Sequence, residues 1–455
     1  MFNVLKNFLA IYQKKIAGGL SASLKTGAAI LTATTFASYV LGLLRDRLLA
    51  QTFGAGRELD IFNAAFIIPD LLLNIFISGA LAAAFIPVFT QLISQKNEKE
   101  AFETANSIIS SGIIVLLALG SLIFIFADYF AIIVAPGFDE AGRETLVKTM
   151  RLLLLSPLIF TFSNALGGML IGYKSFFAYG LSPVFYNFGI IGGIFLSPFL
   201  GIFGPVLGTL AGALLHLGVR IAGILKHNFR YRFAVNFKNQ SFRQVIRLMI
   251  PKMIGQPTEQ LNFWIFAVIA SSLSAGSIAI LNLARNFQSV PVSLFGIAFS
   301  LAAFPALSQA AGEKNKEDYL KILFKTLKNI LLFTGLSALF LYLFGEFFIR
   351  LFFGGGKFSE QNIRLTAQTL AVFSLAIPTE GAIHLLARSF YSLKNTLTPV
   401  LISVAGLIVA AFAGWTLTPN FGLSALPFAF FLGSFSEVIL LSILLKRKIG
   451  KEFAD

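Results

Sequence analysis

The sequence predicts an all-α polytopic membrane protein with about twelve transmembrane helices, arranged as two parallel six-helix lobes around a central cavity. Three observations lead to this prediction. Of the 455 residues, 56% are hydrophobic, 51 are phenylalanine and only 13% are charged, whereas soluble domains carry about 25% charged residues. Twelve apolar segments are long enough to cross a bilayer. The second half of the chain repeats features of the first half, which predicts two similar lobes.

The twelve segments follow from the need for about 20 consecutive apolar residues in each membrane-spanning helix. They cover residues 27–50, 60–93, 105–131, 147–172, 177–200, 203–225, 245–273, 276–308, 320–346, 362–388, 396–417 and 422–445. Three positions are candidates for bends: Gly42, Pro69 and Pro291. Proline removes a backbone donor, and such breaks are tolerated at membrane depth where protein or a water-filled cavity satisfies the freed carbonyl groups.

The distribution of basic residues predicts the orientation. With both termini on the same side, the loops on that side hold 24 of the 36 Lys and Arg residues, and the opposite loops hold five. Cytoplasmic loops carry such an excess, so both termini are predicted to be cytoplasmic. The formal net charge of +15 is therefore explained by orientation better than by binding of nucleic acid.

The domain prediction follows from these spans. An amphipathic cytoplasmic segment at residues 1–26 precedes a first lobe at 27–225, and a basic cytoplasmic linker at 226–244 leads to a second lobe at 245–447 and a tail at 448–455. The first segment has apolar residues at helical spacing opposite lysines, which indicates an interfacial helix; a disordered extension is the alternative.

The repeat has an offset of 218 residues. Phe203-Gly204 recurs as Phe421-Gly422, Pro87 with Gln91 recurs as Pro305 with Gln309, and the charged loop at 97–100 recurs at 315–318. Six spans in each half mean that both halves enter the membrane the same way up, which is the parallel kind of repeat.

Charged residues inside the spans are the candidates for function. At a helix centre each costs about 2.5–3.5 kcal/mol, so it usually faces a cavity or a partner. A paired or interfacial structural role is favoured for Arg47, Asp70, Arg151 and Arg388, and a functional role for Arg45. A guanidinium binds phosphate oxygens through two hydrogen bonds, most strongly where water is scarce, so an arginine facing a central cavity would suit an anionic, phosphorylated substrate.

Other chemistries find little support in the sequence. Cysteine is absent and the three histidines are isolated, so neither a thiolate nor a multi-histidine metal site is expected. The run Gly354-Gly355-Gly356-Lys357 lacks the spacing of a phosphate-binding loop. We expect no enzymatic activity, cofactor or bound metal.

Several stretches resemble the MurJ/MviN family, the lipid II flippases of the MOP transporter superfamily. The first contains Leu44-Arg45-Asp46, Phe53-Gly54-Ala55-Gly56 and Pro69-Asp70-Leu71-Leu72, and later ones contain Phe304-Pro305-Ala306 and Phe352-Phe353-Gly354-Gly355-Gly356. The resemblance extends over about residues 27–447. It implies a MATE-like fold in the bacterial inner membrane and transport of the undecaprenyl-pyrophosphate-linked peptidoglycan precursor from the inner to the outer leaflet. Cell-wall synthesis enzymes are expected as further partners.

The resemblance also implies particular site residues. Arg45 matches the substrate-binding arginine of the first helix, and Asp60 matches a required aspartate. At three other family arginine positions this chain has Tyr39, Leu73 and Asn286, with Arg285 one residue away from the last. Arg285, Asn286 and Lys252 are therefore added to Arg45 and Asp60 as predicted substrate-binding residues. The family commonly has two further helices that form a groove for the lipid tail.

The coupling and the substrate remain open at this point. Transport could be driven by the membrane potential, by Na⁺ or by H⁺. The alternatives are a flippase for another lipid-linked saccharide, a multidrug exporter of the same superfamily, or a non-transporting scaffold for cell-wall enzymes. A cavity lined mainly by carboxylates rather than arginines would favour cationic drugs.

Overall fold

The computed structural model describes residues 24–75, 79–255 and 258–453, and helices dominate all three stretches. The predicted interfacial helix near the N-terminus lies outside the described residues. The helices of the first half are α2 (Leu24–Phe53), α3 (Arg57–Leu73), α4 (Gly79–Ser94), α5 (Glu98–Ile125), α6 (Ala127–Val134), α7 (Glu140–Leu153), α8 (Leu155–Gly172), α9 (Phe176–Ile194), α10 (Ser197–Leu200) and α11 (Phe203–Ile224). Those of the second half are α12 (Gln240–Gly255), α13 (Thr258–Ser271), α14 (Ser277–Pro291), α15 (Ala298–Gly312), α16 (Lys316–Phe353), α17 (Glu360–Ser374), α18 (Ala376–Ser392), α19 (Leu397–Phe421) and α20 (Ala425–Glu452).

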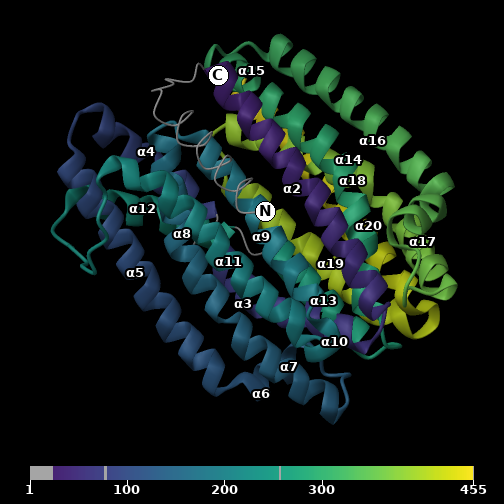
Figure 1. Ribbon diagram of the computed structural model, residues 1–455. Helices are drawn as coiled ribbons and strands as arrows, with labels where there is room; N and C mark the ends of the chain where they lie inside the picture. The colour runs from purple at the N-terminus through teal and green to yellow at the C-terminus, as the bar shows by residue number, and fades with distance from the viewer. Residues whose placement is uncertain (1–23, 76–78, 256–257, 454–455) are drawn as a thin grey trace.

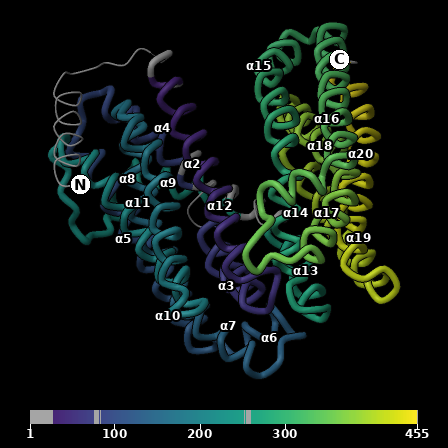
Figure 2. Tube along the Cα trace, turned by 45° about the vertical axis from the view of Figure 1, so that its right-hand side comes forward, coloured from purple at the N-terminus to yellow at the C-terminus, as the bar shows by residue number. Residues whose placement is uncertain are grey.

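The helices form two lobes, which Figure 2 shows side by side. In the first lobe α9 packs between α2 and α11, and α8 packs on α4, α5 and α11; in the second, α18 packs on α16 and α20, and α19 pairs with α20 (Figure 1). The lobes contact each other through α3 against α13 and α14, and through α2 against α16. These contacts lie toward one end of the molecule, and the lobes diverge toward the other end, where α20 ends (Figure 2). This arrangement agrees with the predicted two-lobe fold.

Helix α12 belongs to the segment predicted to open the second lobe, yet it packs on α4 and α5 of the first lobe. Its successor α13 packs on α19 of the second lobe. The consecutive helices α12 and α13 therefore pack on different lobes.

The helices confirm the two-lobe arrangement but do not confirm the number of spans. Among the described residues, seven helices are long and apolar enough to cross a membrane, or eight if the pair α17 and α18, bent by 43°, counts as one span. The predicted spans at 60–93 and 245–273 are each made of two helices of 17 residues or fewer, which flank undescribed positions. The count of twelve stays a prediction.

The bend candidates differ in their surroundings. Pro69 lies inside α3, four residues before that helix ends. Pro291 is the last residue of α14 and is followed by a π-helical turn, Val292–Ile297, as expected where a proline removes a helical donor. Gly42 lies within the continuous helix α2.

The predicted repeat is visible in the turns that join consecutive helices. Asn97 and Asn315 each cap the next helix by accepting a hydrogen bond from the backbone N–H three residues later. The residues before them, Lys96 and Lys314, both adopt left-handed backbone angles (φ 58° and 54°). In both halves the chain therefore leaves one helix and enters the next through the same turn.

Small residues allow the closest helix contact in the first lobe. Gly189 and Gly193 of α9 lie directly against Gly208 and Gly212 of α11, where an added Cβ would meet backbone atoms of the other helix. Such glycine contacts allow close helix packing in lipid. The wall of the cavity described next depends on this pairing, because α9 contributes to it.

Candidate substrate cavity between the lobes

A cavity of about 660 Å³ lies between the two lobes. Helices α2, α3, α8 and α9 line it from the first lobe, and α13 and α14 line it from the second. Its lining combines aromatic and aliphatic side chains with polar groups, in the way small-molecule sites are usually built. The polar lining residues are Arg45, Asp46, Asn63, Asp70, Asn74, Tyr186, Gln260, Asn282 and Asn286.

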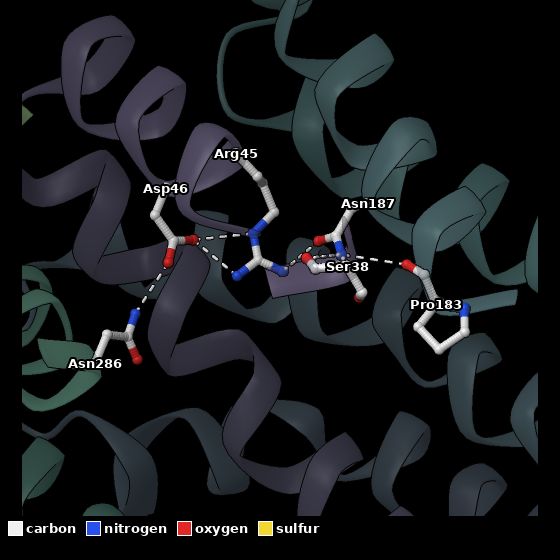
Figure 3. A network of polar contacts seen from close by, with 6 residues as sticks. All are labelled: Ser38, Arg45, Asp46, Pro183, Asn187 and Asn286. Atoms are coloured by element: carbon white, nitrogen blue, oxygen red, sulfur yellow. Dashed lines mark hydrogen bonds and ion pairs between the residues drawn. The ribbon is translucent and has the colours of Figure 1, made fainter. Parts of the chain in front are cut away.

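Arg45 is held at the cavity wall by three hydrogen bonds (Figure 3). Its Nε and Nη2 donate to Oδ1 of Asp46 at 2.9 and 2.7 Å, and its Nη1 donates to Oδ1 of Asn187 at 3.1 Å. The amide of Asn187 is oriented in turn by Ser38 and by the carbonyl oxygen of Pro183. The side chain of Arg45 remains 27% exposed, so the structure places a fixed guanidinium where the sequence predicts one.

Asp46 connects this arginine to the second lobe. Its Oδ1 accepts from Arg45, and its Oδ2 accepts from Nδ2 of Asn286 at 3.0 Å. Asn286 lies on α14 and lines the cavity. The position that the family resemblance assigns to an arginine therefore carries an amide that contacts the partner of Arg45 across the cavity.

Arg285, the neighbouring residue, lies outside the cavity lining. Its Nη1 and Nη2 donate to the two carboxylate oxygens of Glu380 at 2.9 Å each. The rings of Phe263 and Phe430 lie 5.0 and 4.7 Å from its guanidinium carbon. The change in direction by about 100° between successive helical residues thus turns Arg285 into the second lobe, where a buried ion pair holds it.

Asp60 also lies outside the cavity lining. Its side chain is 1% exposed, and its two oxygens accept hydrogen bonds from the backbone N–H groups of Gly276 (2.7 Å) and Ala279 (2.8 Å). Those groups belong to the start of α14 in the second lobe. Free N–H groups and the positive end of the helix dipole favour a carboxylate there, so Asp60 holds the two lobes together.

Other bonds between the lobes lie near the same end. The backbone oxygen of Gln51 accepts from the N–H of Lys357, and its side-chain amide donates to the oxygen of Gly354 (2.8 Å in both cases). The backbone N–H of Gly137 donates to Oγ of Ser271 at 3.0 Å. The glycine-rich run that lacks phosphate-loop spacing is therefore a turn that docks on α2.

The close approach at this end requires glycine at two positions. Gly276 has φ 93°, and an added Cβ would meet the backbone of Ala55. Gly54 has φ 68°, and an added Cβ would meet the backbone of Lys357. We call the region around Asp60, Gln51 and these two glycines the closed end.

The remaining predicted residues are placed as follows. Tyr39 lies on α2 and is 68% exposed, whereas Leu73 lines the cavity. Lys252 belongs to α12, but its side chain lies outside the described residues. Asp70 is exposed to the cavity. The charged residues in the described lining are therefore one arginine and two aspartates, and charge alone does not identify the substrate.

Apart from Asn286, which the family resemblance implied, the amides of the lining were missed by sequence reasoning, which followed charges. Asn282 and Asn286 are four residues apart on α14, and Asn63 and Asp70 are seven apart on α3, so each pair shares one helix face. Polar residues repeated at helical spacing inside apolar segments were the signal that could have identified this lining. Among the described residues, no group of three or more His, Asp or Glu side chains could hold a metal ion.

Comparisons with known proteins relate the sequence and the fold to one family. The family profile described as "Lipid II flippase MurJ" matches residues 49–455. The lipid II flippase MurJ of Burkholderia cenocepacia is 27% identical over 434 residues, which cover 92% of this chain and 84% of the relative. A probable lipid II flippase MurJ of Thermotoga maritima is 27% identical over 432 residues, which cover 92% and 85%.

Solved structures show the same relationship. A lipid II flippase MurJ in an inward closed conformation superimposes with a TM-score of 0.79 at 26% identity, covering 94% of this chain and 90% of the other. An inward-facing MATE-family multidrug transporter of the MOP superfamily superimposes with a TM-score of 0.74 at 14% identity, covering 93% and 98%. At that identity the second likeness concerns the fold alone.

Proposed function

The chain belongs to the MurJ family of lipid II flippases, and from this membership we propose that it moves lipid II, the lipid-linked peptidoglycan precursor, from the inner to the outer leaflet of the bacterial inner membrane. The observation that carries the proposal to this chain is the cavity between the lobes, with the guanidinium of Arg45 fixed at its wall. The protein acts by alternating access and carries out no covalent chemistry.

In the proposed mechanism the headgroup of the substrate enters the cavity while its polyprenyl chain stays in the bilayer. The exposed part of Arg45 binds the pyrophosphate, because a planar guanidinium pairs with two phosphate oxygens at once. The cavity amides and aromatic rings would contact the saccharide and peptide parts. The sites proposed here are Arg45 and Asn286 in the cavity and Asp60 at the closed end; Lys252 of α12 stays a predicted binding residue.

Binding and opening are coupled through Asp46 in this mechanism. A phosphate that pairs with Arg45 competes with Asp46 for the same donors, Nε and Nη2. Asp46 also accepts from Asn286 of the second lobe, so its displacement weakens a contact between the lobes. A ligand can shift a conformational equilibrium only through such differences in contact between the two states.

The direction of opening follows from the predicted orientation. The lobes meet at the end where α2 leads into α3, and they diverge toward the end where α15 leads into α16 (Figure 2). The turns from α4 to α5 and from α15 to α16 are basic and contain Lys96 and Lys314. Basic loops mark the cytoplasmic side, so we place both termini in the cytoplasm and the open end of the cavity on that side. The membrane potential or a gradient of Na⁺ or H⁺ would drive the return of the empty carrier.

The proposal is tested by complementation of a bacterium depleted of its own lipid II flippase. The wild-type chain should restore growth and the exposure of lipid II on the outer leaflet, measured with a reagent that does not cross the membrane. Arg45→Ala should restore neither. Arg364→Ala, the control, removes an exposed arginine of α17 and should restore both. If Arg45→Ala and the wild type restore growth equally while neither restores lipid II on the outer leaflet, the flippase proposal is wrong and a scaffold for cell-wall enzymes is favoured.

A further inference from the structure

The basic linker between α11 and α12 is bound along the first lobe by its own backbone. We call residues 226–239 the strap. The backbone N–H groups of Arg232, Ala234 and Asn236 donate to side-chain oxygens of Asn106, Ser110 and Ser107 on α5, each at 3.1 Å. A linker held only at its ends would not form these bonds. They fix the position of the strap along α5, so the strap presents the same side chains outward.

Aromatic side chains fasten the inner face of the strap. The ring of Phe229 lies 5.4 Å from that of Phe102, and the ring of Tyr231 lies 4.8 Å from that of Phe162 on α8. The hydroxyl of Tyr231 also lies 3.1 Å from Oγ of Ser110. The side chains between these anchors therefore point away from the lobe.

The outer face of the strap combines exposed aromatic rings with arginines. Phe233 is 65% exposed and Phe237 is 68% exposed. Arg230 and Arg232 are exposed beside them, and residues 226–252 contain no Asp or Glu. Lys238 differs, because it shares a shallow groove with Glu100 and Glu103. The positive charge beside Phe233 thus comes from the two arginines, and Lys226 adds a further exposed cation at the start of the strap.

The position of the strap along α5 indicates which part of the membrane its outer face contacts. Ser110 lies about 18 Å from the start of α5, at 1.5 Å per residue. From Ile113 onward α5 is apolar, and Ile114, Val115 and Leu117 are exposed. In a membrane protein such a surface faces acyl chains. Phe233 lies between Arg232 and Ala234, which bond to α5 just before this surface begins, so we place Phe233 near the border between headgroups and acyl chains. Figures 1 and 2 show the strap on the side of the first lobe turned away from the second lobe.

We propose that the strap is a binding surface for anionic phospholipids, with Phe233 and Phe237 inserted at the edge of the acyl region and Arg230 and Arg232 paired with lipid phosphates. Aromatic residues favour the headgroup level of a bilayer, and basic residues beside a membrane bind anionic lipids. Since the strap leads into α12, which also packs on the first lobe, this contact would hold that lobe against the leaflet. The proposal does not depend on which substrate the cavity carries.

A single tryptophan in the strap tests the proposal in the full-length protein. The natural Trp264 and Trp415 are replaced by phenylalanine, Phe233→Trp is added, and the protein is reconstituted in phosphatidylcholine vesicles that contain phosphatidylglycerol. Either lipid is supplied with brominated acyl chains, which quench a neighbouring tryptophan. We expect stronger quenching by brominated phosphatidylglycerol than by an equal fraction of brominated phosphatidylcholine, and a loss of this preference at high salt.

Two matched controls make the outcome specific. A protein that keeps only Trp415, which is 70% exposed on α19, should be quenched equally by both lipids. Arg230→Gln with Arg232→Gln should lower the preference for phosphatidylglycerol about thirtyfold, at about 1 kcal/mol for each cation near an anionic surface. Lys321→Gln with Lys325→Gln, an exposed pair on α16, removes the same charge and should leave the preference unchanged.

Two results would overturn the proposal. Absence of quenching at position 233 by either lipid would show that the strap does not meet acyl chains and would favour a protein partner on this face. Equal quenching by both lipids, unchanged by Arg230→Gln with Arg232→Gln, would show insertion without recognition of anionic headgroups. Neither result would affect complementation by the wild-type chain, so failure of this proposal is distinguishable from failure of the flippase proposal.

Discussion

Asn in place of Asp60 should release the closed end while leaving each lobe folded. Asp60 accepts two backbone hydrogen bonds, at 2.7 and 2.8 Å, from the first residues of α14. A hydrogen bond to a charged group contributes about 1.5–3 kcal/mol, and a carboxylate at a helix N-terminus contributes about 0.3–2 kcal/mol. Asn keeps one acceptor and loses the charge, and water can satisfy the freed N–H groups once the lobes separate. We therefore expect a net loss of about 2 kcal/mol, or roughly a thirtyfold shift toward the separated state.

The absence of cysteine from the sequence makes the measurement direct. Spin labels on Ala141→Cys and Gln361→Cys, exposed positions of α7 and α17 in the two lobes, report the separation at the closed end by pulsed electron resonance. Asp60→Asn should add a population at longer distance. Glu58→Gln removes an exposed carboxylate from the same helical turn and should leave the distribution as in the wild type. If the two variants give the same distribution, the assignment of Asp60 to the closed end is refuted. The same holds if a thermal melt shows that the Asp60→Asn variant is already unfolded at the starting temperature.

Three further predictions concern the cavity and the ion pair behind it. Arg45→Lys keeps the charge but loses the planar pair of donors, so it should complement a flippase-depleted strain poorly; growth equal to wild type would contradict a role in phosphate binding. Asn286→Ala removes the contact with Asp46 and should broaden the distance distribution between the lobes less than Asp60→Asn does, because it breaks one partly exposed hydrogen bond to a carboxylate, whereas Asp60→Asn disturbs two buried ones and removes a charge. Glu380→Gln leaves the buried charge of Arg285 without its carboxylate and should cost about 3–5 kcal/mol of stability, measured as a lower melting temperature. Arg285→Met combined with Glu380→Leu should recover most of that loss. No recovery would contradict the interpretation of this pair as a replaceable structural ion pair.

The fold was predictable from the sequence because lipid imposes simple rules. Apolar segments must be helical in a bilayer, and basic residues concentrate in the cytoplasmic loops. The repeated turn at Lys96-Asn97 and Lys314-Asn315 was visible in the sequence because its cap depends on residues within four positions. Local chemistry therefore carried the architecture, whereas the packing of α12 on the first lobe depends on contacts that the sequence pattern does not contain.

The site was predictable only in part, for a related reason. Arg45 was identified because an arginine inside an apolar span needs a polar surface, and the structure supplies the cavity, Asp46 and Asn187. The position of Asp60 was not predictable, because its partners are backbone N–H groups 216 and 219 residues later in the chain. Arg285 was grouped with the cavity residues because its carboxylate partner, Glu380, lies on another helix 95 residues away.

Two contacts between the lobes differ in their access to substrate, and this difference gives the proposed transport cycle its order. The bond from Asn286 to Asp46 lies in the cavity lining, where a phosphate on Arg45 can disturb it. The bonds from α14 to Asp60 are buried behind that lining, where substrate cannot compete for them. Both contacts involve α14, so a movement of this helix that follows loss of the first bond changes the geometry of the second. Substrate binding would then weaken the closed end through α14 without touching it, whereas an empty cavity would keep both contacts and remain closed on that side.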